Sequence, residues 1–521
     1  MSKAASFRKV AKGGALFTAG SFSATFLHFL TGIIVIRILE RSDYGLISLA
    51  MTAVVMLSML STLGLKTAIP RFLAKYRAEG DSALVGEVAF TGLVSAVGLS
   101  TGLAALLYVN AGMAAGMFHK PELRAVFEVL ALMLPAMALM DTLTAIFQGI
   151  ENARAKVLFQ DIGVNLLRLA LLLLLVLFGL GFREVLWIYV ASSWLILTFY
   201  LGYAVRTLFG VLRLQLSYRV AKDLLWFSLP LLGINVMNNV MSWTPMLMLG
   251  YLKPAAEVGL FSAPLRLANI LPVVLAGMTF LYLPVATKLT ARGSIKDVQE
   301  LYVSTTKWAF LLTLPLLLYF MVDAEFVVSL LFGAPYADAA GVLRMMVLGL
   351  AIHTFAGPNG ITLISLGNTS APFVASLLVA IASVALCLLF VPKYGALGAA
   401  LGTAVARTLS NVYLSAVLYR KFRIHPLVSS YLKPVLLATA GATAGGLLVG
   451  GAGGDSIVAH LALFLAITGL TLISPLVTRT LSLTDMNLLE SVERRILGSR
   501  KFTERAREWL DMPSASSKNR E

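Results

Sequence analysis

The sequence predicts an all-α polytopic membrane protein of about fourteen transmembrane helices, arranged as two parallel-repeat six-helix lobes plus two extra C-terminal helices. Three observations predict this fold class: the composition, the apolar runs and an internal repeat. Hydrophobic residues make up 58% of the 521 residues, charged residues make up 13%, and the mean hydropathy is +0.85. This composition leaves too little polar surface for a soluble fold and indicates an integral membrane protein.

Apolar runs of about 20 residues are long enough to cross the hydrocarbon core as helices. The first run follows a basic stretch, but it is too long for the core of a signal peptide, so we interpret it as a helix. The predicted segments are 13–36, 43–65, 83–109, 122–148, 158–180, 184–208, 223–251, 258–286, 306–333, 337–365, 369–391, 395–419, 430–450 and 456–478. Because Asp323, Glu325 and Asp338 interrupt the ninth and tenth segments, twelve or thirteen spans are the alternatives.

Three short landmarks recur at a constant offset of 214 residues. Asp43-Tyr44-Gly45-Leu46 returns as Glu257-Val258-Gly259-Leu260, Ile69-Pro70 as Leu283-Pro284, and Met117-Phe118 as Leu331-Phe332. The offset covers an even number of segments, so the second copy has the same orientation in the bilayer as the first. We therefore expect an N-lobe at 1–209, a C-lobe at 210–425, appended helices at 426–480 and a cytoplasmic amphipathic tail at 481–521.

Lysine and arginine residues are concentrated on one side of the predicted membrane, as is usual for cytoplasmic loops. With the N-terminus inside, and with basic residues at the segment ends counted with the adjacent loop, 31 of the 42 basic residues fall on the cytoplasmic side, 7 on the outer side and 4 deep within apolar segments. The sequence thus predicts a multi-pass protein of the cell membrane with both termini in the cytoplasm. Topology explains most of the net charge of +16, so nucleic acid is not required as a partner.

The four arginines within apolar segments are the main candidates for substrate binding: Arg168, Arg266, Arg344 and Arg407. An arginine at the centre of a membrane helix costs about 2.5–3.5 kcal/mol, so it normally faces a watered cavity or a polar partner. Arg407 is the strongest candidate, because it lies too deep in its segment to reach either interface easily. For the other three arginines, snorkelling to headgroups or pairing with a neighbouring helix is the alternative.

Several arginines around a cavity favour an anionic substrate, because a guanidinium group forms paired, charge-assisted hydrogen bonds with phosphate oxygens. Asp141 is an acid within the predicted membrane segments and could compete with an anionic substrate for these arginines. We predict that it forms a structural ion pair with Arg168, and a proton or cation site is the alternative. Asn235 and Asn239 are candidates for hydrogen bonds to sugar hydroxyls, and helix packing is the alternative for such polar residues.

The tenth segment contains the strongest helix-breaking signal within the membrane pattern. Gly357, Pro358 and Gly360 lie together in Ala356-Gly357-Pro358-Asn359-Gly360. This stretch is either an unwound hinge or binding element that faces protein or water, or the early end of the helix.

Motifs at the helix ends carry a resemblance to a known group of transporters. They are Arg37-Ile38-Leu39 with Asp43-Tyr44-Gly45, Leu63-Gly64-Leu65 with Ala68-Ile69-Pro70-Arg71, Gly149, and Tyr394-Gly395-Ala396-Leu397-Gly398-Ala399-Ala400. In this order the chain resembles the polysaccharide-export oligosaccharide-lipid flippases of the multidrug/oligosaccharidyl-lipid/polysaccharide exporter superfamily. The resemblance implies movement of a polyprenyl-pyrophosphate-linked glycan from the cytoplasmic to the outer leaflet by alternating access, with Arg71 among the residues that contact the substrate.

Three other functions are alternatives to glycan-lipid transport. A lipid II flippase shares the fourteen-helix plan and the cationic cavity, whereas a multidrug extruder usually has twelve helices and an acid suited to cations. A membrane glycan polymerase or ligase would present acids or histidines on a large outer loop, and the predicted loops are short. We expect no catalytic residue, cofactor or metal, a monomeric chain, and as partners the lipid-linked glycan, membrane lipids and glycan polymerase or glycosyltransferases of the same pathway.

Overall fold

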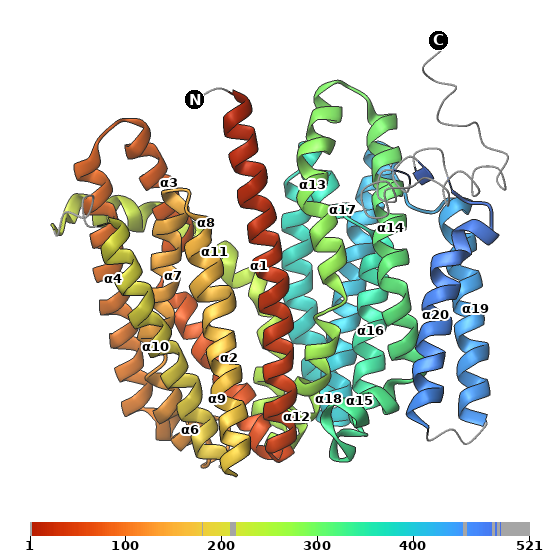
Figure 1. Cartoon of the computed structure of the whole chain (residues 1–521), viewed down its shortest axis with the longest axis horizontal. Coiled ribbons are helices and arrows are strands. Elements are labelled where there is room, and N and C mark those ends of the chain that lie inside the picture. Colours follow the sequence, from red (N-terminus) through yellow and green to blue (C-terminus); the bar gives the residue numbers. More distant parts are fainter. Residues whose placement is uncertain are drawn as a thin grey trace. The chain divides into compact units, whose positions relative to one another are not determined.

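The computed structural model describes residues 3–179, 181–208, 215–451, 456–481, 485–486 and 490 (Figure 1). In this part of the chain every regular element is a helix. The α-helices are α1 (Lys3–Ile38), α2 (Arg41–Ser61), α3 (Leu65–Ala78), α4 (Ser82–Val109), α5 (Ala111–Met117), α6 (Leu123–Ala131), α7 (Leu134–Gly149), α8 (Ala153–Ala155), α9 (Val164–Phe178), α10 (Phe182–Leu208), α11 (Tyr218–Leu252), α12 (Ala255–Ala268), α13 (Pro272–Ala291), α14 (Ile295–Val322), α15 (Ala324–Phe332), α16 (Ala339–Ala356), α17 (Asn359–Ser365), α18 (Ser370–Phe422), α19 (Ser429–Gly451) and α20 (Ile457–Val477). A π-helical segment, η1 (Lys156–Gly163), and a 3-10 turn, η2 (Ala334–Tyr336), complete the order.

Each predicted segment coincides with one helix, one consecutive set of helices or one half of α18. Among the described residues, nine helices are long and apolar enough to cross a membrane, or eleven when two bent pairs are included. α18 counts once in that number, although non-helical backbone at Gly395 divides it into two helices. The all-helical, multi-spanning fold is therefore confirmed.

The predicted break in the tenth segment is present. α16 ends at Ala356 and α17 begins at Asn359, with Gly357 between them at φ +70°. A side chain is disfavoured at this φ, and a Cβ on Gly357 would also lie 2.1 Å from the Thr306 hydroxyl of α14. By length and composition the two helices still form one candidate span, Ala339–Ser365, which the break interrupts.

The contacts divide the chain into two units. Unit 1 contains Met1–Ile270, Val328–Val342 and Val379–Ala406, and unit 2 contains Leu271–Val327, Leu343–Leu378 and Arg407–Glu521. In unit 1, α3, α4 and α7 pack around Ile69, Leu73 and Phe147. In unit 2, α19 and α20 lie side by side (Figure 1).

Two repeated glycines bring α2 and α12 together within unit 1. A Cβ on Gly45 would lie 1.9 Å from the carbonyl oxygen of Ala255, and a Cβ on Gly259 would lie 2.2 Å from that of Arg41. Arg41 and Ala255 are the first residues of the two helices and keep the repeat offset of 214. The two contacts are thus equivalent under exchange of the repeats, as in an isologous two-fold interface, which is the arrangement that the predicted parallel duplication requires.

Polar contacts join the chain around these helix starts, which we call the distal end of unit 1. Arg41 forms a 3.2 Å ion pair with Asp338, and the Arg37 Nε donates to the Leu331 carbonyl at 2.9 Å. The Lys120 ammonium donates to the carbonyl of Gly250. Glu257 accepts from the backbone N–H of Ala396 at 2.7 Å. Sequence positions before 121 are thereby tied to positions after 249, so the distal end is closed.

The beginning of the predicted tail is anchored in unit 2. The Asp485 carboxylate pairs with Lys307 of α14 and accepts at 2.6 Å from the indole N–H of Trp308. Met486 is fully buried beside Trp308 and Leu476. The rest of the predicted amphipathic tail lies almost entirely outside the described residues.

Candidate functional site

Arg168 of α9 is buried in unit 1 and is held entirely by neutral groups. Its Nε and one terminal nitrogen donate to Ser192 and Ser193 of α10 at 3.2 and 3.4 Å, and its guanidinium lies 4.4 Å from the ring centre of Tyr189. Both serine hydroxyls donate to the Tyr189 carbonyl, which leaves their lone pairs directed at the arginine. These contacts orient the guanidinium group but do not neutralise its charge.

Arg266 of α12 is held in a similar way. Its Nε donates to the Tyr44 hydroxyl at 2.7 Å, and a terminal nitrogen donates to the His28 carbonyl at 3.2 Å. Gly32 of α1 makes room for this side chain, because a Cβ there would lie 2.3 Å from a guanidinium nitrogen. The same terminal nitrogen lies 3.4 Å from the His28 Nε2.

The structure brings Arg168 and Arg266 together, a pairing that no sequence pattern predicts. Tyr189 lies beside both guanidinium groups. Arg168 is ten residues before the end of α9 and Arg266 eleven residues after the start of α12, so both lie about 15 Å along their spans from these ends. Among the residues that the structure describes, no carboxylate pairs with either arginine. The cluster is a cationic site without a counterion.

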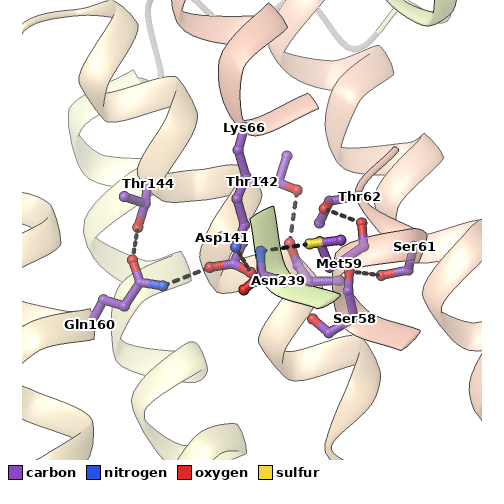
Figure 2. Close-up of polar contacts among 11 residues, drawn as sticks. Ser58, Met59, Ser61, Thr62, Lys66, Asp141, Thr142, Thr144, Gln160 and Asn239 are labelled. Atoms are coloured by element: carbon purple, nitrogen blue, oxygen red, sulfur yellow. Dashed lines mark hydrogen bonds and ion pairs between the residues drawn. The ribbon is translucent and has the colours of Figure 1, made fainter. Parts of the chain in front are cut away.

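Asp141 of α7 has different partners from those predicted. Its carboxylate forms a 2.6 Å ion pair with Lys66 of α3 and accepts at 2.7 Å from Gln160 of η1. Figure 2 shows these side chains converging on Asp141, with Thr144 donating to Gln160 at 2.8 Å. The predicted pair with Arg168 is therefore wrong, and the carboxylate is neutralised by a lysine.

The π-helical segment explains the misassigned partner. Each residue of a π-helix turns the chain less than in an α-helix, so η1 changes which face of the following helix points to α7. Gln160 lies within η1, whereas Arg168 is eight residues further, about 12 Å along the axis. η1 therefore directs Gln160 to Asp141 and leaves Arg168 facing α10.

Arg407 belongs to a polar face in unit 2 that meets the break between α16 and α17. Asn411, one turn later on α18, donates to the Arg407 carbonyl at 2.8 Å and lies 3.1 Å from the His353 Nδ1. Asn359, at the start of α17, donates to Ser415 at 3.2 Å. Within the described part of unit 2, no carboxylate pairs with the half-buried Arg407. These amide contacts hold the broken helix against α18.

The other predicted site residues are separate from these clusters. Arg344 donates to the Met321 carbonyl at 3.1 Å, as in the predicted alternative of pairing with a neighbouring helix. Arg71 is exposed and stacks 4.0 Å from the ring centre of Phe227. Asn239 donates to the Asn235 carbonyl at 2.9 Å and contacts the Met59 sulfur at 3.7 Å (Figure 2). Their roles in substrate binding remain predictions.

Several partners in these sites were not identified from the sequence. In the sequence Tyr44 belongs to a repeated motif and Lys66 is one of many basic residues in the predicted loops, so neither position indicates its partner. Asn411 carried a usable signal, because Arg407, Asn411 and Ser415 recur every four residues on one helix face. Tyr189, Ser192 and Ser193 have no distinguishing sequence signal, because aromatic and small polar residues are common throughout membrane helices.

Family comparisons connect the chain to polysaccharide biosynthesis proteins. The family described as "Polysaccharide biosynthesis protein" matches residues 10–290, and the MatE family matches residues 230–389. The succinoglycan biosynthesis transport protein ExoT of Rhizobium meliloti (strain 1021) is 25% identical over 332 residues, which are 63% of each chain. The chain thus spans less than two thirds of that relative's length in the match.

Solved structures share the fold at low sequence identity. An inward closed lipid II flippase, MurJ, is 14% identical with a TM-score of 0.70, over 89% of this chain and 98% of that one. An inward-facing multidrug resistance transporter of the MATE family is 16% identical with a TM-score of 0.63, over 77% and 94%. Its outward-facing counterpart has a TM-score of 0.54 at 16% identity, over 80% and 95%.

Proposed function

Because the chain belongs to the polysaccharide biosynthesis protein family, we propose that it is a flippase that moves a polyprenyl-pyrophosphate-linked oligosaccharide across the membrane by alternating access. The fold that it shares with transporters and the duplicated bundle support movement of a substrate rather than catalysis. The transport direction would be from the cytoplasmic to the outer leaflet of the cell membrane, with both termini in the cytoplasm.

The cluster of Arg168 and Arg266 is the observation that carries this proposal. Arg168 is buried and Arg266 is half-buried, and arginines within membrane segments often mark a substrate pathway. Their charges are oriented by hydroxyls, a carbonyl and an aromatic ring, so they remain available to an anion. A pyrophosphate supplies negative charge and several oxygens for the two planar guanidinium groups.

The same cluster separates the alternative substrates. A cationic drug would be repelled by two arginines that lack a counterion, which disfavours multidrug export. A lipid II molecule also carries a polyprenyl pyrophosphate, so it would satisfy the cluster equally well. The family match and the similarity to a succinoglycan transport protein favour a surface polysaccharide precursor over lipid II.

The test is flipping of a fluorescent polyprenyl-pyrophosphate-linked oligosaccharide in proteoliposomes containing the full chain. We expect Arg168→Gln and Arg266→Gln each to slow flipping about tenfold, equivalent to about 1.4 kcal/mol. Arg266→Lys should recover part of the rate, because lysine keeps the charge but loses the planar fork. Arg183→Gln is the matched control, since Arg183 is an exposed arginine at the start of α10.

The rate of flipping should depend on the charge of the two arginines and on the group attached to the polyprenyl lipid. A stably folded Arg168→Gln/Arg266→Gln double variant that flips at the wild-type rate would refute the proposed site. A polyprenyl glycan without phosphate should be a poor substrate for the wild-type protein. Faster flipping of lipid II than of the oligosaccharide lipid would move the assignment to the cell-wall precursor.

A further inference from the structure

The distal end of unit 1 contains a pocket that the proposed transport cycle does not use. Its volume is about 570 Å³, within the range of about 300–1,000 Å³ typical of small-molecule sites. Asp43 begins one wall, His119 and Glu122 form another, and Tyr251 and Lys253 form the third. The pocket therefore lies where the starts of α2 and α12 meet the connection between α5 and α6.

The pocket walls carry unused hydrogen-bonding groups of both charges. Within the part of the chain that the structure describes, the side chains of Asp43, Glu122 and Lys253 form no hydrogen bond or ion pair. The Tyr251 ring packs edge-on against His119 and is 54% exposed. Two carboxylates disfavour a simple anion, and the many charged groups disfavour an apolar compound.

These groups match the chemistry of a saccharide. Sugar hydroxyls both donate and accept hydrogen bonds, so they can satisfy carboxylates, an imidazole and an ammonium group together. An exposed aromatic ring supplies apolar contact area with a polar edge, which suits the mixed faces of a sugar ring. The pocket volume leaves room for more than a single small solute.

The pocket is built from both repeats, and its shape depends on the closed distal end. The Lys120 side chain joins two of its walls by donating to the carbonyls of Phe118 and Gly250. The close approach of Gly45 to α12 joins the third wall. Separation of α2 from α12 would divide the pocket, so a ligand that touches all walls must favour the closed state.

We propose that this pocket binds the saccharide part of the exported glycan from the outer side and thereby stabilises the closed distal end. The inference rests on the proposed function, which supplies both the glycan and the outer orientation of the distal end. Exported oligosaccharide that accumulates outside the cell would then slow further transport by holding the protein closed. The pocket is thus a feedback site, separate from the arginine cluster that binds the pyrophosphate.

Binding can be measured on the full chain in lipid nanodiscs by isothermal titration calorimetry. The probe is the lipid-free oligosaccharide released by mild acid from the cell's own lipid-linked glycan. We expect wild-type protein to bind it, Tyr251→Ala to weaken binding about tenfold, and Tyr251→Phe to weaken it much less, because the ring is kept. Met113→Ala is the control, since Met113 is an exposed α5 residue outside the pocket.

Transport then separates this inference from the proposed function. In proteoliposomes, external oligosaccharide should slow wild-type flipping, whereas Tyr251→Ala should flip at the wild-type rate and resist the inhibition. Arg266→Gln should flip about tenfold more slowly than the wild-type protein but still bind the oligosaccharide. Absence of binding by wild-type protein, or equal binding by Tyr251→Ala, overturns the pocket assignment while leaving glycan-lipid flipping intact. Absence of flipping by the wild-type protein overturns the proposed function instead, and normal flipping by the arginine variants overturns only the arginine site.

Discussion

Gly45→Ala is expected to open the distal end of unit 1. The added Cβ would lie 1.9 Å from the Ala255 carbonyl oxygen, which is backbone and cannot rotate away. α2 and α12 must therefore separate by about 1 Å or more to restore ordinary contact. Overpacking of this kind typically costs about 1–3 kcal/mol, which corresponds to a change of about 5- to 150-fold in the ratio of closed to open states.

The magnitude can be checked with spin labels at positions 113 and 394, whose native side chains Met113 and Tyr394 are exposed. Cys387→Ser removes the single native cysteine first. Pulsed electron resonance should show a longer mean distance in Gly45→Ala. Gly102→Ala in α4 is the matched control, because a Cβ there meets no atom within 4 Å. Unchanged distance distributions in a folded Gly45→Ala protein would refute the role of the glycine contact in closure.

Two further predictions concern the buried ion pairs. Asp485→Asn and Lys307→Met should each lower stability by about 3–5 kcal/mol, because each leaves one buried charge without its partner. The Lys307→Met/Asp485→Leu double variant should recover most of the loss in thermal unfolding, and additive losses would show that the pair itself is unimportant. Asp141→Asn should destabilise the fold less, since Lys66 is about half exposed, and should flip with the same pH dependence as the wild-type protein between about pH 6 and 8. A large change in the pH dependence of flipping would instead assign Asp141 to proton coupling.

The sequence predicted the helices far better than it predicted the partners of the charged residues. Helix positions follow from apolar runs, which are properties of single segments, so each of the fourteen predicted segments is recovered. The pairing of Asp141 depends on the rotation of a neighbouring helix, and η1 changes that rotation without a clear sequence signal. Arg266 could be identified as costly in the membrane, but Gly32, which makes room for it, lies 234 positions earlier.

The repeat carried more structural information than its short motifs suggested. Gly45 and Gly259 were landmarks of equal spacing, and the structure shows that they contact each other's helix. A duplicated membrane bundle must bring equivalent helices together about an axis and also separate them during transport, so small residues are needed where the backbones touch. The equivalent acidic residues near these glycines, Asp43 and Glu257, have different contacts. Glu257 accepts from the backbone N–H of Ala396, whereas Asp43 faces the distal pocket.

The proposed alternating-access cycle would use the two charge clusters of unit 1 in different ways. Asp141 and Lys66 neutralise each other, and Gln160 and Thr144 extend the network, so this cluster can stay formed without a ligand. Arg168 and Arg266 have no such compensation among the described residues, so in the proposed function they are the groups that would gain most from a bound anion. Arg266 also bonds Tyr44, one residue from Gly45, so an anion bound there acts directly on the α2–α12 contact. The proposed function therefore predicts that binding at the cluster and opening of the distal end are coupled through the start of α2.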